Sequence, residues 1–471
     1  MKNTKIICTI GPETEDVNIL KEMIMAGMDV ARINLSHSDH DFAQKVIENI
    51  RKLNKELGTS VGILMDIKGP KIRISHCHNE YVYLKAGTEI ILTTKYTKNK
   101  DKFLINYPEV INDVKTGDKI LLDDGLVELL VLDKKTEDVV CEILNEGYIR
   151  NNTSVNVPGV DLSIDFLSAS DKNDILFASL MDADYISLSF VRNANDVLDV
   201  NDMLIGLRNE HVQIIAKIEN NSAIKDIDNI IKVSDGIMVA RGDLGVEIAL
   251  EKVPSVQKKI VKKCFDANKI CIVATQMLSS MQEKPTPTRA EVSDVANAVI
   301  DGADAVMLSG ETAIGNYPVK TIETMAKIIV NIEENLDYEN ILNSKKGEGK
   351  QDITSVIAHN VVDSANRIKT AAIIVSTISG YTAQKVSSYR PSCPILTITP
   401  DEAVARSLSL NWGIIPIVSP MFNSTDEIVE NAIKTFKEKI AERNTNIIIT
   451  GGFPMNEESN TNFMKIEEIK E

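Results

Sequence analysis

The chain has 471 residues, of which 43% are hydrophobic and 25% charged, so it can bury a large core and is expected to form more than one domain. Its formal net charge of −16 argues against binding nucleic acid or an anionic membrane through the general surface field. No apolar run reaches the roughly 20 residues that span a bilayer, and the start lacks a signal-type apolar core, which predicts a cytoplasmic protein.

Strand-like apolar runs recur along the chain with helix-like stretches between most of them. They lie at 4–10, 28–35, 61–67, 184–190, 212–218, 236–240, 270–275 and 304–309. Strands that alternate with helices indicate a parallel sheet with crossover helices, and eight of them is the number of a closed (β/α)8 barrel. We therefore predict an α/β fold with a TIM barrel as catalytic domain, made of residues 1–68 and 163–343.

Residues 69–162 interrupt this alternation with short strands and turns. Strands are expected at 89–93 and 119–122, and turns at 116–118, 123–125 and 145–147. The pattern predicts an all-β domain inserted after the third barrel strand. Because it leaves and returns at the rim where such barrels place their active sites, we expect a lid that excludes water. A decorative domain or an oligomer contact is the alternative.

Residues 344–471 begin with a polar passage of linker composition and then alternate helix and strand again. Helices are expected at 356–368, 382–388, 401–410 and 426–441, and strands at 371–376, 394–399, 414–418 and 446–450. This predicts an open α/β domain. Its first loop brings hydroxyl groups and a glycine before a helix, at Thr377, Ser379, Gly380 and Thr382. That arrangement suits a phosphate group, although an ordinary helix cap has the same composition.

Polar residues follow the predicted barrel strands, where the active site of such a barrel lies. They are Thr9, Gly11, Arg32, Asn34, Asp66, Ser187, Ser189, Lys217, Glu219, Arg241, Asp243, Thr275, Gln276, Ser309 and Glu311. Farther on, residues 285–292 indicate a rigid turn into a helix with Thr288 as its N-cap.

Two carboxylates and a lysine stand out among these residues. Lys217 and Glu219 end the fifth run, and Asp243 follows the sixth. Mg²⁺ binds a few carboxylates and completes its octahedron with water and substrate oxygens, so Glu219 and Asp243 suffice for it. A structural ion pair at the barrel rim is the alternative, since burial of one such charge alone costs several kcal/mol, roughly.

The neighbouring groups suit phosphoryl transfer. Arg32 can bind phosphate oxygens with both arms of its guanidinium, and Lys217 can neutralise charge on the transferring group or on an enolate. Gly242 and Asp243 begin a helix-like stretch whose N–H groups can receive a carboxylate, and the Thr275 hydroxyl can pass a proton through water to an enolate carbon.

Six separated motifs, in order along the chain, closely resemble pyruvate kinase. They are RINLSH at 32–37, DIKGP at 66–70, AKIEN at 216–220, ARGDLG at 240–245, PTRAE at 287–291 and MLSGET at 307–312. The resemblance runs from TIGP at 9–12 through the carboxyl-terminal domain. It implies transfer of the phosphoryl group of phosphoenolpyruvate to ADP with Mg²⁺, for which Mn²⁺ can substitute, in a homotetramer regulated by a phosphorylated effector.

The resemblance also implies roles for individual residues. Arg32 and Lys217 would hold the phosphoryl group, Glu219 and Asp243 the Mg²⁺, and Gly242, Asp243 and Thr275 the substrate carboxylate. Thr275, Ser309 and Glu311 would surround the water that protonates the enolate. Asn34, Ser36, His37 and Arg73 would face the nucleotide, and Thr377, Ser379, Gly380 and Thr382 match the effector phosphate loop.

Lys71 departs from the pattern of many relatives, which carry a glutamate there and bind K⁺ nearby. The family's K⁺ region corresponds to Asn34, Ser36, Asp66 and the carbonyl of Ile67. The Lys71 ammonium is a fixed monovalent cation that would repel a second one, so we expect activity without K⁺.

Two further departures concern the nucleotide and the effector. Thr153 occupies the place of a family lysine that contributes to nucleotide binding, and Arg150 or Lys71 would have to compensate. The acidic segment 456–460 lacks a glycine common in the family, and its two carboxylates argue against tight binding of a bisphosphate. We therefore expect activation by a sugar or nucleotide monophosphate.

Two other functions and one other metal site remain open. A phosphoenolpyruvate- or pyruvate-binding lyase or aldolase can share the barrel and the Mg²⁺ carboxylates, and a catalytically dead sensor would keep the effector domain. His76, Cys77 and His78 suggest a transition metal, but an ordinary strand is favoured because no third and fourth ligand lies nearby. We expect no disulfide among the six scattered cysteines.

Overall fold

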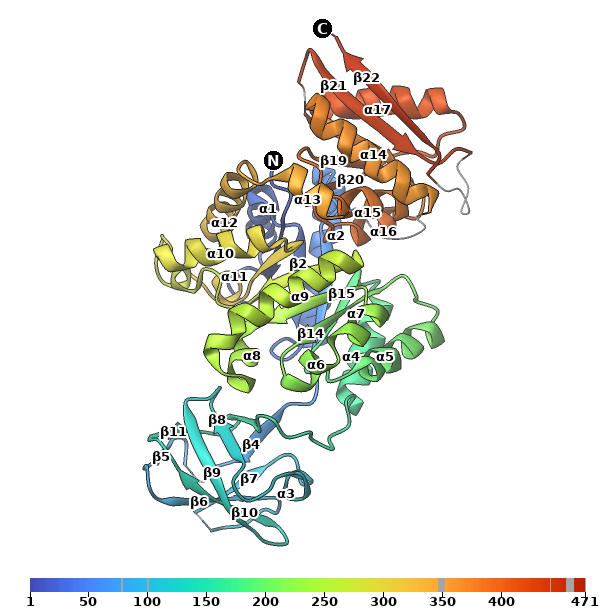
Figure 1. The fold of residues 1–471 in the computed structure, drawn as a ribbon. Helices are drawn as coiled ribbons and strands as arrows, with labels where there is room; N and C mark the ends of the chain where they lie inside the picture. The colour runs from blue at the N-terminus through green and yellow to red at the C-terminus, as the bar shows by residue number, and fades with distance from the viewer. Residues whose placement is uncertain (78, 100, 346–351, 441, 455–460, 471) are drawn as a thin grey trace.

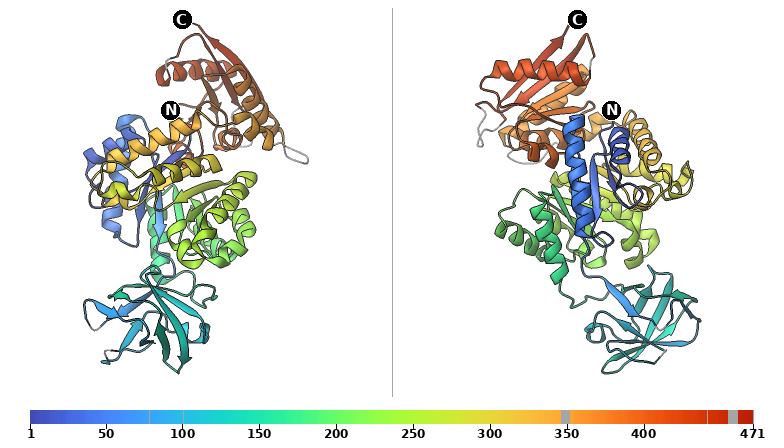
Figure 2. Two further views of the ribbon diagram at one scale, coloured as in Figure 1. Left: turned by 60° about the vertical axis from the view of Figure 1, so that its left-hand side comes forward. Right: turned by 180° about the vertical axis from the view of Figure 1, so that it is seen from behind.

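The computed structural model describes the chain except residues 78, 100, 346–351, 441, 455–460 and 471. Three parts follow one another along its length (Figure 1): a β-rich part at one end, a barrel in the middle and the carboxyl-terminal part at the other end. The views in Figure 2 show the same order from two other sides, so the barrel lies between the other two parts.

The predicted eight-stranded barrel is confirmed. Its parallel strands close in the order β1-β17-β16-β15-β14-β13-β3-β2. They are β1 (Lys5–Thr9), β2 (Val30–Asn34), β3 (Gly62–Ile67), β13 (Tyr185–Leu188), β14 (Gln213–Ile218), β15 (Gly236–Ala240), β16 (Ile270–Ala274) and β17 (Ala305–Leu308). Each lies within one of the predicted runs. Apolar side chains such as Leu64, Ile215 and Met238 form one core cluster, and a larger cluster joins the strands to the surrounding helices.

Helices cover the outside of this barrel. They are α1 (Val17–Ala26), α2 (His40–Leu57), α4 (Ala169–Leu180), α5 (Ala194–Gly206), α6 (Asn221–Lys225), α7 (Ile227–Val233), α8 (Arg241–Glu247), α9 (Val253–Ala267), α10 (Arg289–Asp301), α11 (Gly310–Ala313), α12 (Pro318–Glu333) and α13 (Tyr338–Ser344). Thr288 caps α10 and forms a capping box with Glu291, which confirms the predicted N-cap.

The β-rich part leaves the barrel after β3 and returns before α4. Its elements are β4 (Ile72–His76), β5 (Val82–Leu84), β6 (Glu89–Thr93), β7 (Lys102–Ile105), α3 (Val110–Asp113), β8 (Lys119–Leu122), β9 (Val127–Lys134), β10 (Asp138–Ile143), β11 (Gly147–Ile149) and β12 (Ser154–Asn156). Seven of the strands close into a small barrel around a core of their own, and β5 pairs with β11. The expected β insertion therefore also carries one short helix, α3.

The carboxyl-terminal part is a five-stranded sheet with helices. It contains α14 (Ile353–Ile368), β18 (Ala372–Ser376), α15 (Tyr381–Ser388), β19 (Ile395–Thr399), α16 (Glu402–Ser407), β20 (Ile414–Val418), α17 (Thr425–Lys439), β21 (Thr445–Gly451) and β22 (Phe463–Ile469). The strand order is β20-β19-β18-β21-β22, and only β22 runs antiparallel to its neighbour. Strand β22 was not predicted from the sequence.

The inserted and carboxyl-terminal parts meet opposite ends of the barrel. Lys5, near the start of β1, donates to the Ile414 carbonyl, and the Tyr185 hydroxyl at the start of β13 donates to the Ser407 carbonyl at 2.7 Å. The carboxyl-terminal part therefore covers the amino ends of the strands, and the inserted part faces their carboxyl ends.

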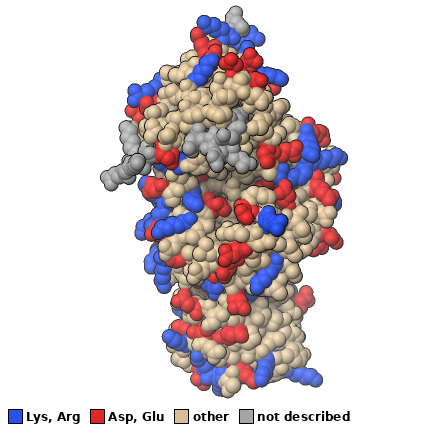
Figure 3. Space-filling view, turned by 90° about the vertical axis from the view of Figure 1, so that its right-hand side faces the viewer, with Lys and Arg blue, Asp and Glu red and all other residues tan. Residues whose placement is uncertain are grey.

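Charge and hydropathy of the described residues agree with this globular architecture. Acidic and basic side chains are interspersed over the face shown in Figure 3. In the part of the chain that is described, no helix combines the length and apolar character needed to cross a membrane. All six cysteines are buried free thiols.

Candidate active site

A cavity of about 160 Å³ lies at the carboxyl ends of the barrel strands and collects most of the predicted site residues. Its lining includes Arg32, Asn34, Ser36, His37, Lys71, Lys217, Glu219, Asp243, Thr275 and Ser309. These residues come from positions spread over most of the barrel sequence, so the closed strand order brings them together. Gly242, Asp66, Ile67 and Glu311 lie behind this lining and contact residues that belong to it.

Asp66 anchors the two cations of the cavity. Arg32 donates from Nε to Asp66 Oδ2 at 2.7 Å, and Lys217 Nζ lies 3.3 Å from Asp66 Oδ1. Burial alone would raise the pKa of Asp66, but the charges of Lys217 and Arg32 lower it to about 2. Asp66 is therefore ionised, and it holds both cations in place.

Lys217 lies between two carboxylates and a hydroxyl. Its Nζ donates to Ser189 Oγ at 2.7 Å and lies 3.1 Å from Glu219 Oε1. Desolvation would lower the pKa of Lys217, yet Asp66 and Glu219 more than offset it and the pKa is raised. The side chain is therefore a fixed ammonium ion at the base of the cavity.

Glu219 and Asp243 have the properties of a divalent-cation site. The Phe190 N–H donates to Glu219 Oε2 at 2.6 Å, whereas the buried Oε1 accepts no hydrogen bond from the described residues. Desolvation raises the pKa of Glu219, Lys217 lowers it, and the nearby Asp243 carboxylate raises it again. The Lys217 ammonium is the one charged partner of Oε1 among the described residues, so a divalent cation would add a second one and relieve the repulsion between the carboxylates, and the donor set fits Mg²⁺.

Thr275 lies at the end of β16 in a strained backbone conformation. Its φ is 69° and that of Gln276 is 54°, both in the left-handed region that non-glycine residues rarely adopt. The turn places Thr275 Oγ1 2.9 Å from the Gly242 N–H, which donates to it. Arg241 stabilises the turn by donating to the carbonyls of Ala274 and Thr275.

Ser309 lines the cavity, and the Glu311 carboxylate behind it holds the Ser309 backbone. Glu311 is buried and accepts from the N–H groups of Ser309 at 2.8 Å and Leu278 at 3.1 Å. It thereby fixes the end of β17 and the loop after β16. The buried Ser309 Oγ lines the cavity and has no hydrogen-bond partner among the described residues, so it is available to a substrate or a water molecule.

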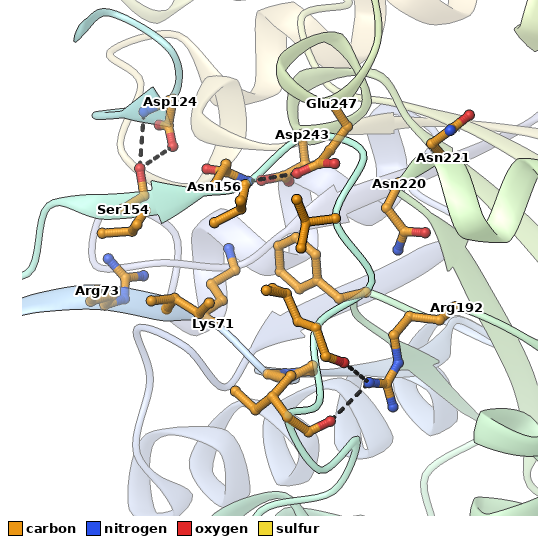
Figure 4. A pocket seen from close by; sticks show the side chains of 18 of the residues that line it. Lys71, Arg73, Asp124, Ser154, Asn156, Arg192, Asn220, Asn221, Asp243 and Glu247 are labelled. Carbon is orange, nitrogen blue, oxygen red and sulfur yellow. Dashed lines mark hydrogen bonds between the residues drawn. The ribbon is translucent and has the colours of Figure 1, made fainter. Parts of the chain in front are cut away.

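A second cavity of about 410 Å³ separates the inserted part from the barrel rim. It shares Lys71, His37 and Asp243 with the first one, so the two cavities adjoin. Figure 4 shows Asn156 of the inserted part beside the barrel side chains Asp243 and Glu247, with Lys71 and Arg73 farther along the cavity. Arg73 donates to the Asn152 carbonyl at 2.7 Å.

The predicted monovalent-cation region is already occupied by internal contacts. Asn34 Oδ1 accepts from the Ser36 N–H at 3.1 Å, and the Ile67 carbonyl accepts from Ser189 Oγ at 2.7 Å. Lys71 Nζ lies 5.1 Å from the centre of the Phe190 ring. Lys71 thus brings a positive charge to the same edge of the cavity.

The predicted effector loop lies apart from this site, between β18 and α15. Gly380 adopts a φ of 84°, and its N–H donates to Thr377 Oγ1 at 3.0 Å. Ser379 is exposed, while Thr382 is buried and hydrogen-bonds Thr461 at 2.7 Å. The acidic segment 456–460 lies outside the described residues.

Two sequence interpretations can be compared with local structure. Thr153 is a buried residue of the cleft lining, and its Oγ1 accepts from the Arg150 N–H, so it offers the cleft no positive charge as a lysine would. Burial raises the pKa of the Cys77 thiol to about 11. His78 lies outside the described residues, and the described ones contain no group of three or more His, Cys, Asp or Glu that could hold a metal ion.

Ser189 and Phe190 contribute more than the sequence indicated. Ser189 was noted only as a polar residue at a strand end, yet it bridges Lys217 and the Ile67 carbonyl. Phe190, at a φ of 58°, turns its N–H toward Glu219. The sequence signal for Ser189 was its position directly after a barrel strand. Phe190 acts through its backbone N–H, which every residue except proline has, so its side chain gave no signal.

Comparisons with known proteins agree with this geometry. Residues 1–322 match the family model "Pyruvate kinase, barrel domain", and residues 355–467 match "Pyruvate kinase, alpha/beta domain". The chain is 44% identical to pyruvate kinases of Clostridium perfringens, over 100% of both chains, and Geobacillus stearothermophilus, over 100% of this chain and 81% of that one. A solved pyruvate kinase from Cryptosporidium parvum superposes with a TM-score of 0.94 at 36% identity, covering 99% of this chain and 96% of that one.

Proposed function

The chain belongs to the pyruvate kinase family and is a phosphotransferase with pyruvate kinase activity, and we propose how its own residues carry out the reaction. In this reaction the bond between phosphorus and the enol oxygen of phosphoenolpyruvate breaks, and a bond to a β-phosphate oxygen of ADP forms. The enolate then takes a proton on its methylene carbon to give pyruvate. Phosphoryl transfer needs mainly positioning and neutralisation of charge.

Arg32 and Lys217 hold the phosphoryl group in this proposal. The observation that carries it is their common attachment to Asp66 in one buried cavity, which keeps both cations fixed before substrate arrives. Preorganised charge of this kind stabilises a transition state without reorganisation. Lys217 also lies where it can neutralise the enolate oxygen that the phosphoryl group leaves.

Glu219 and Asp243 hold the Mg²⁺ that the family generally uses. When bound, this cation would neutralise phosphoryl and enolate oxygens during the transfer. Thr275 and the N–H groups of Gly242 and Asp243 receive the substrate carboxylate. The Gly242 N–H already donates to Thr275 Oγ1, so the carboxylate would take the place of that hydroxyl.

Thr275, Ser309 and Glu311 surround the proton donor to the enolate. The unpartnered Ser309 hydroxyl and the Thr275 hydroxyl both line the cavity, and Glu311 fixes the backbone of Ser309. A water molecule held by these hydroxyls would deliver the proton. Glu311 thus acts through Ser309.

The nucleotide lies in the larger cleft between the barrel and the inserted domain. Asn34, Ser36 and His37 line the passage from the phosphoryl site, and Arg73 lines the cleft itself. Lys71 and Arg150 also line this cleft, which supports their compensation for the family lysine absent at Thr153. The inserted domain, 69–162, then serves as the lid over the barrel domain.

Activity without K⁺ is part of the proposal. Lys71 supplies a permanent positive charge beside the cavity, and the Asp66 carboxylate and Ile67 carbonyl already have partners within the protein. Little remains for a monovalent cation to coordinate, and Lys71 would repel it.

Regulation and assembly complete the proposal. The carboxyl-terminal domain, 344–471, binds a sugar or nucleotide monophosphate at Thr377, Ser379, Gly380 and Thr382, and the chain forms a homotetramer in the cytoplasm. Ser379 is exposed next to Gly380, whose backbone is in the left-handed region, and this supports the proposal that the loop binds an effector. Six buried free thiols support a reducing compartment.

A coupled assay of pyruvate formation from phosphoenolpyruvate and ADP tests the function. Lys217→Met should lower kcat by about 100-fold or more, since loss of one preorganised charge costs about 3–4 kcal/mol in the transition state. Lys262→Met, which removes an exposed lysine paired with Asp266, should retain wild-type kcat. Thermal unfolding shows whether each variant is folded.

Three outcomes separate the alternatives. Wild-type protein that forms no pyruvate from phosphoenolpyruvate and ADP, but releases it by carbon–carbon cleavage of a hydroxy-oxo acid, would indicate a lyase or aldolase. Folded wild-type protein that turns over neither substrate would indicate a sensor. Full activity of Lys217→Met would overturn the assignment of Lys217.

A further inference from the structure

Two hydrogen bonds join the inserted domain to the barrel beside the candidate metal site. Asn156 Nδ2 donates to Glu247 Oε1 at 3.3 Å, and Ser222 Oγ donates to Asp161 Oδ1 at 2.7 Å. Both inserted-domain residues belong to one segment, 156–161, which we call the strap. Figure 4 shows the contact between Asn156 and Glu247 with Asp243 next to it. The strap lines the cleft and is tied to the barrel at both of its ends.

The barrel partners of the strap follow the two metal-site carboxylates. Ser222 lies three residues after Glu219, in α6, and Glu247 lies four residues after Asp243, in α8. Residues four apart share one face of a helix, so Glu247 and Asp243 face the cleft together. One end of the strap is therefore attached to the helix that follows Glu219, and the other end to the helix that contains Asp243.

The strap has a fixed length because a tight turn lies between its attachments. The Val160 N–H donates to the Val157 carbonyl at 3.3 Å, and Gly159 adopts a φ of 79°. Proline at the second position, here Pro158, and glycine at the third are typical of a type II turn. A turn of this kind keeps Asn156 and Asp161 at a constant separation.

Helix α8 is held by contacts at both of its ends. It has seven residues and no side-chain cap at its N-terminus, where the Gly242 N–H is held by Thr275 and the Arg241 side chain by the carbonyls of Ala274 and Thr275. Among the described residues no hydrogen bond to the Asp243 side chain is found. Toward its end, Glu247 accepts from Asn156, and a Cβ added at Gly125 of the inserted domain would lie 3.6 Å from Val246. The inserted domain therefore holds the end of α8 opposite Asp243.

We propose that Asn156 and Asp161, acting through Glu247 and Ser222, are positioning residues that set the separation of Glu219 and Asp243. Docking of the inserted domain and binding of the divalent cation are then coupled, and by linkage each favours the other. The proposal rests on the proposed function in one respect, namely that these two carboxylates hold the cation.

The test measures binding of Mn²⁺ to the full chain by the electron paramagnetic resonance signal of the free ion. Ser222→Ala and Asn156→Ala should each raise the Kd of Mn²⁺ about three- to tenfold, the effect of one lost hydrogen bond. Ser163→Ala is the matched control, because its Oγ donates to Asp113 of the inserted domain at 2.7 Å and makes no hydrogen bond to α6 or α8 among the described residues. This control should bind Mn²⁺ as the wild type does.

A second variant and a second readout protect the test against misfolding. Gly159→Ala meets no atom within 4 Å but strains the turn, and it should also weaken Mn²⁺ binding. In the wild type, Mn²⁺ should slow hydrogen exchange of the strap, and this effect should shrink in Ser222→Ala.

The outcomes distinguish the strap from the metal site itself. Wild-type Mn²⁺ affinity in Ser222→Ala and Asn156→Ala, or equal weakening in Ser163→Ala, would overturn the positioning role. Glu219→Gln should abolish Mn²⁺ binding. If it does not, the metal assignment of the proposed function is wrong. If Glu219→Gln abolishes binding while Ser222→Ala and Asn156→Ala bind Mn²⁺ as the wild type does, only the role of the strap is wrong.

Discussion

Lys71 acts on its neighbours through charge. Its ammonium lies 5.1 Å from the centre of the Phe190 ring, whose backbone N–H binds Glu219. The same charge adds to the lowering of the His37 pKa that burial causes, and it opposes the rise that burial causes in the pKa of Glu219. One side chain thus influences both the nucleotide passage and the metal site, so its replacement has measurable consequences at each.

Lys71→Glu should convert the protein into one that requires K⁺. The substitution removes the fixed cation and places a carboxylate beside Glu219, so a monovalent ion would be needed to offset the repulsion, which amounts to about 3 kcal/mol for charges roughly 5 Å apart at the protein surface. Initial rates in Na⁺ and K⁺ buffers should differ by about tenfold or more, a ratio worth about 1.4 kcal/mol.

Two controls accompany this measurement. The wild type should show equal rates in both salts, and strong activation by K⁺ would contradict the proposal. Lys68→Glu changes a neighbouring lysine whose side chain is 42% exposed and 4.0 Å from Asp174, and it should show no dependence on K⁺.

His37 should titrate at a higher pH when Lys71 is neutralised. Burial, followed by the charges of Lys71, Arg73 and Arg32, lowers the pKa of His37 below its usual 6.5. As the pH falls below 6.5, the imidazole of His37 is protonated in the unfolded chain before it is protonated in the folded chain. Protonation of His37 therefore lowers the free energy of unfolding between pH 6.5 and the lower pKa of the folded state. Above pH 6.5 this effect disappears. Lys71→Met should raise the folded pKa.

Titration of ¹³C-labelled histidines by NMR checks this expectation. The chain has six histidines, and His37→Gln identifies the resonance of interest. Lys262→Met, which removes an exposed lysine outside both cavities, serves as the control. An unchanged pKa of His37 in Lys71→Met would show that the Lys71 charge lies elsewhere in solution.

At the scale of elements, β13 links the carboxyl-terminal domain to the active site. At its start, Tyr185 donates to the Ser407 carbonyl and accepts from the Leu410 N–H. Just beyond its end, Ser189 binds Lys217 at 2.7 Å. The strand has four residues, so these two sets of contacts lie close together along the chain.

Arg406→Met should weaken this link strongly. Arg406 binds Asp184 at 2.9 Å and Asp182 at 2.7 Å, and its removal leaves Asp184 with Arg51 and the Ile63 N–H. Burial already raises the pKa of Asp184, so the carboxylate is poorly compensated. Breaking a buried pair costs about 3–5 kcal/mol, and hydrogen exchange of β13 amides should accelerate accordingly.

An exposed arginine provides the comparison. Arg367 is 77% exposed and pairs with Asp363 one helical turn away, so Arg367→Met should change the same exchange rates by less than about 0.5 kcal/mol. Equal effects of the two substitutions would mean that the Arg406 pair is no stronger than a surface ion pair.

The barrel could be predicted from sequence because its strands are buried on both faces. Each reads as a continuous apolar run, and every residue of β1, β15 and β16 is buried. Strand β22 was missed for the opposite reason. It is an edge strand with charged residues at 465, 467 and 468 and no clean alternation, so neither strand pattern applies.

The site could be predicted in part, for a related reason. Arg32, Lys217 and Glu219 were found because each charge interrupts or ends an apolar run. The central position of Asp66 could not be found, since it depends on the register that pairs Asp66 with Asn34 on one side and Ser187 on the other. Long-range pairing of this kind leaves no signal in a single sequence.

At the scale of the whole molecule, the catalytic cavity lies between two domains that contact different ends of the same barrel. The inserted domain reaches α6 and α8 at the carboxyl ends, and the carboxyl-terminal domain reaches β1 and β13 at the amino ends. A ligand in either domain can therefore affect the site through the barrel strands. Such coupling becomes cooperative only when chains associate.

Strand β22 offers a surface for that association. It is the last strand of its sheet and pairs with β21 on one side only, as far as the described residues show. Met464 and Ile466 are 38% and 48% exposed on it. An unpaired edge with exposed apolar side chains is a template for pairing with a second copy, and a lysine on it opposes such pairing.

Ile466→Lys should therefore reduce the proposed tetramer to dimers. Size-exclusion chromatography with light scattering would show about half the wild-type mass, and activation by a phosphorylated effector should lose its sigmoidal dependence while the basal rate persists. Lys465→Ala, which removes a charge from the adjacent position, should leave the tetramer intact. A wild type that elutes as a monomer, or an Ile466→Lys variant with unchanged mass, would show that β22 does not carry the contact.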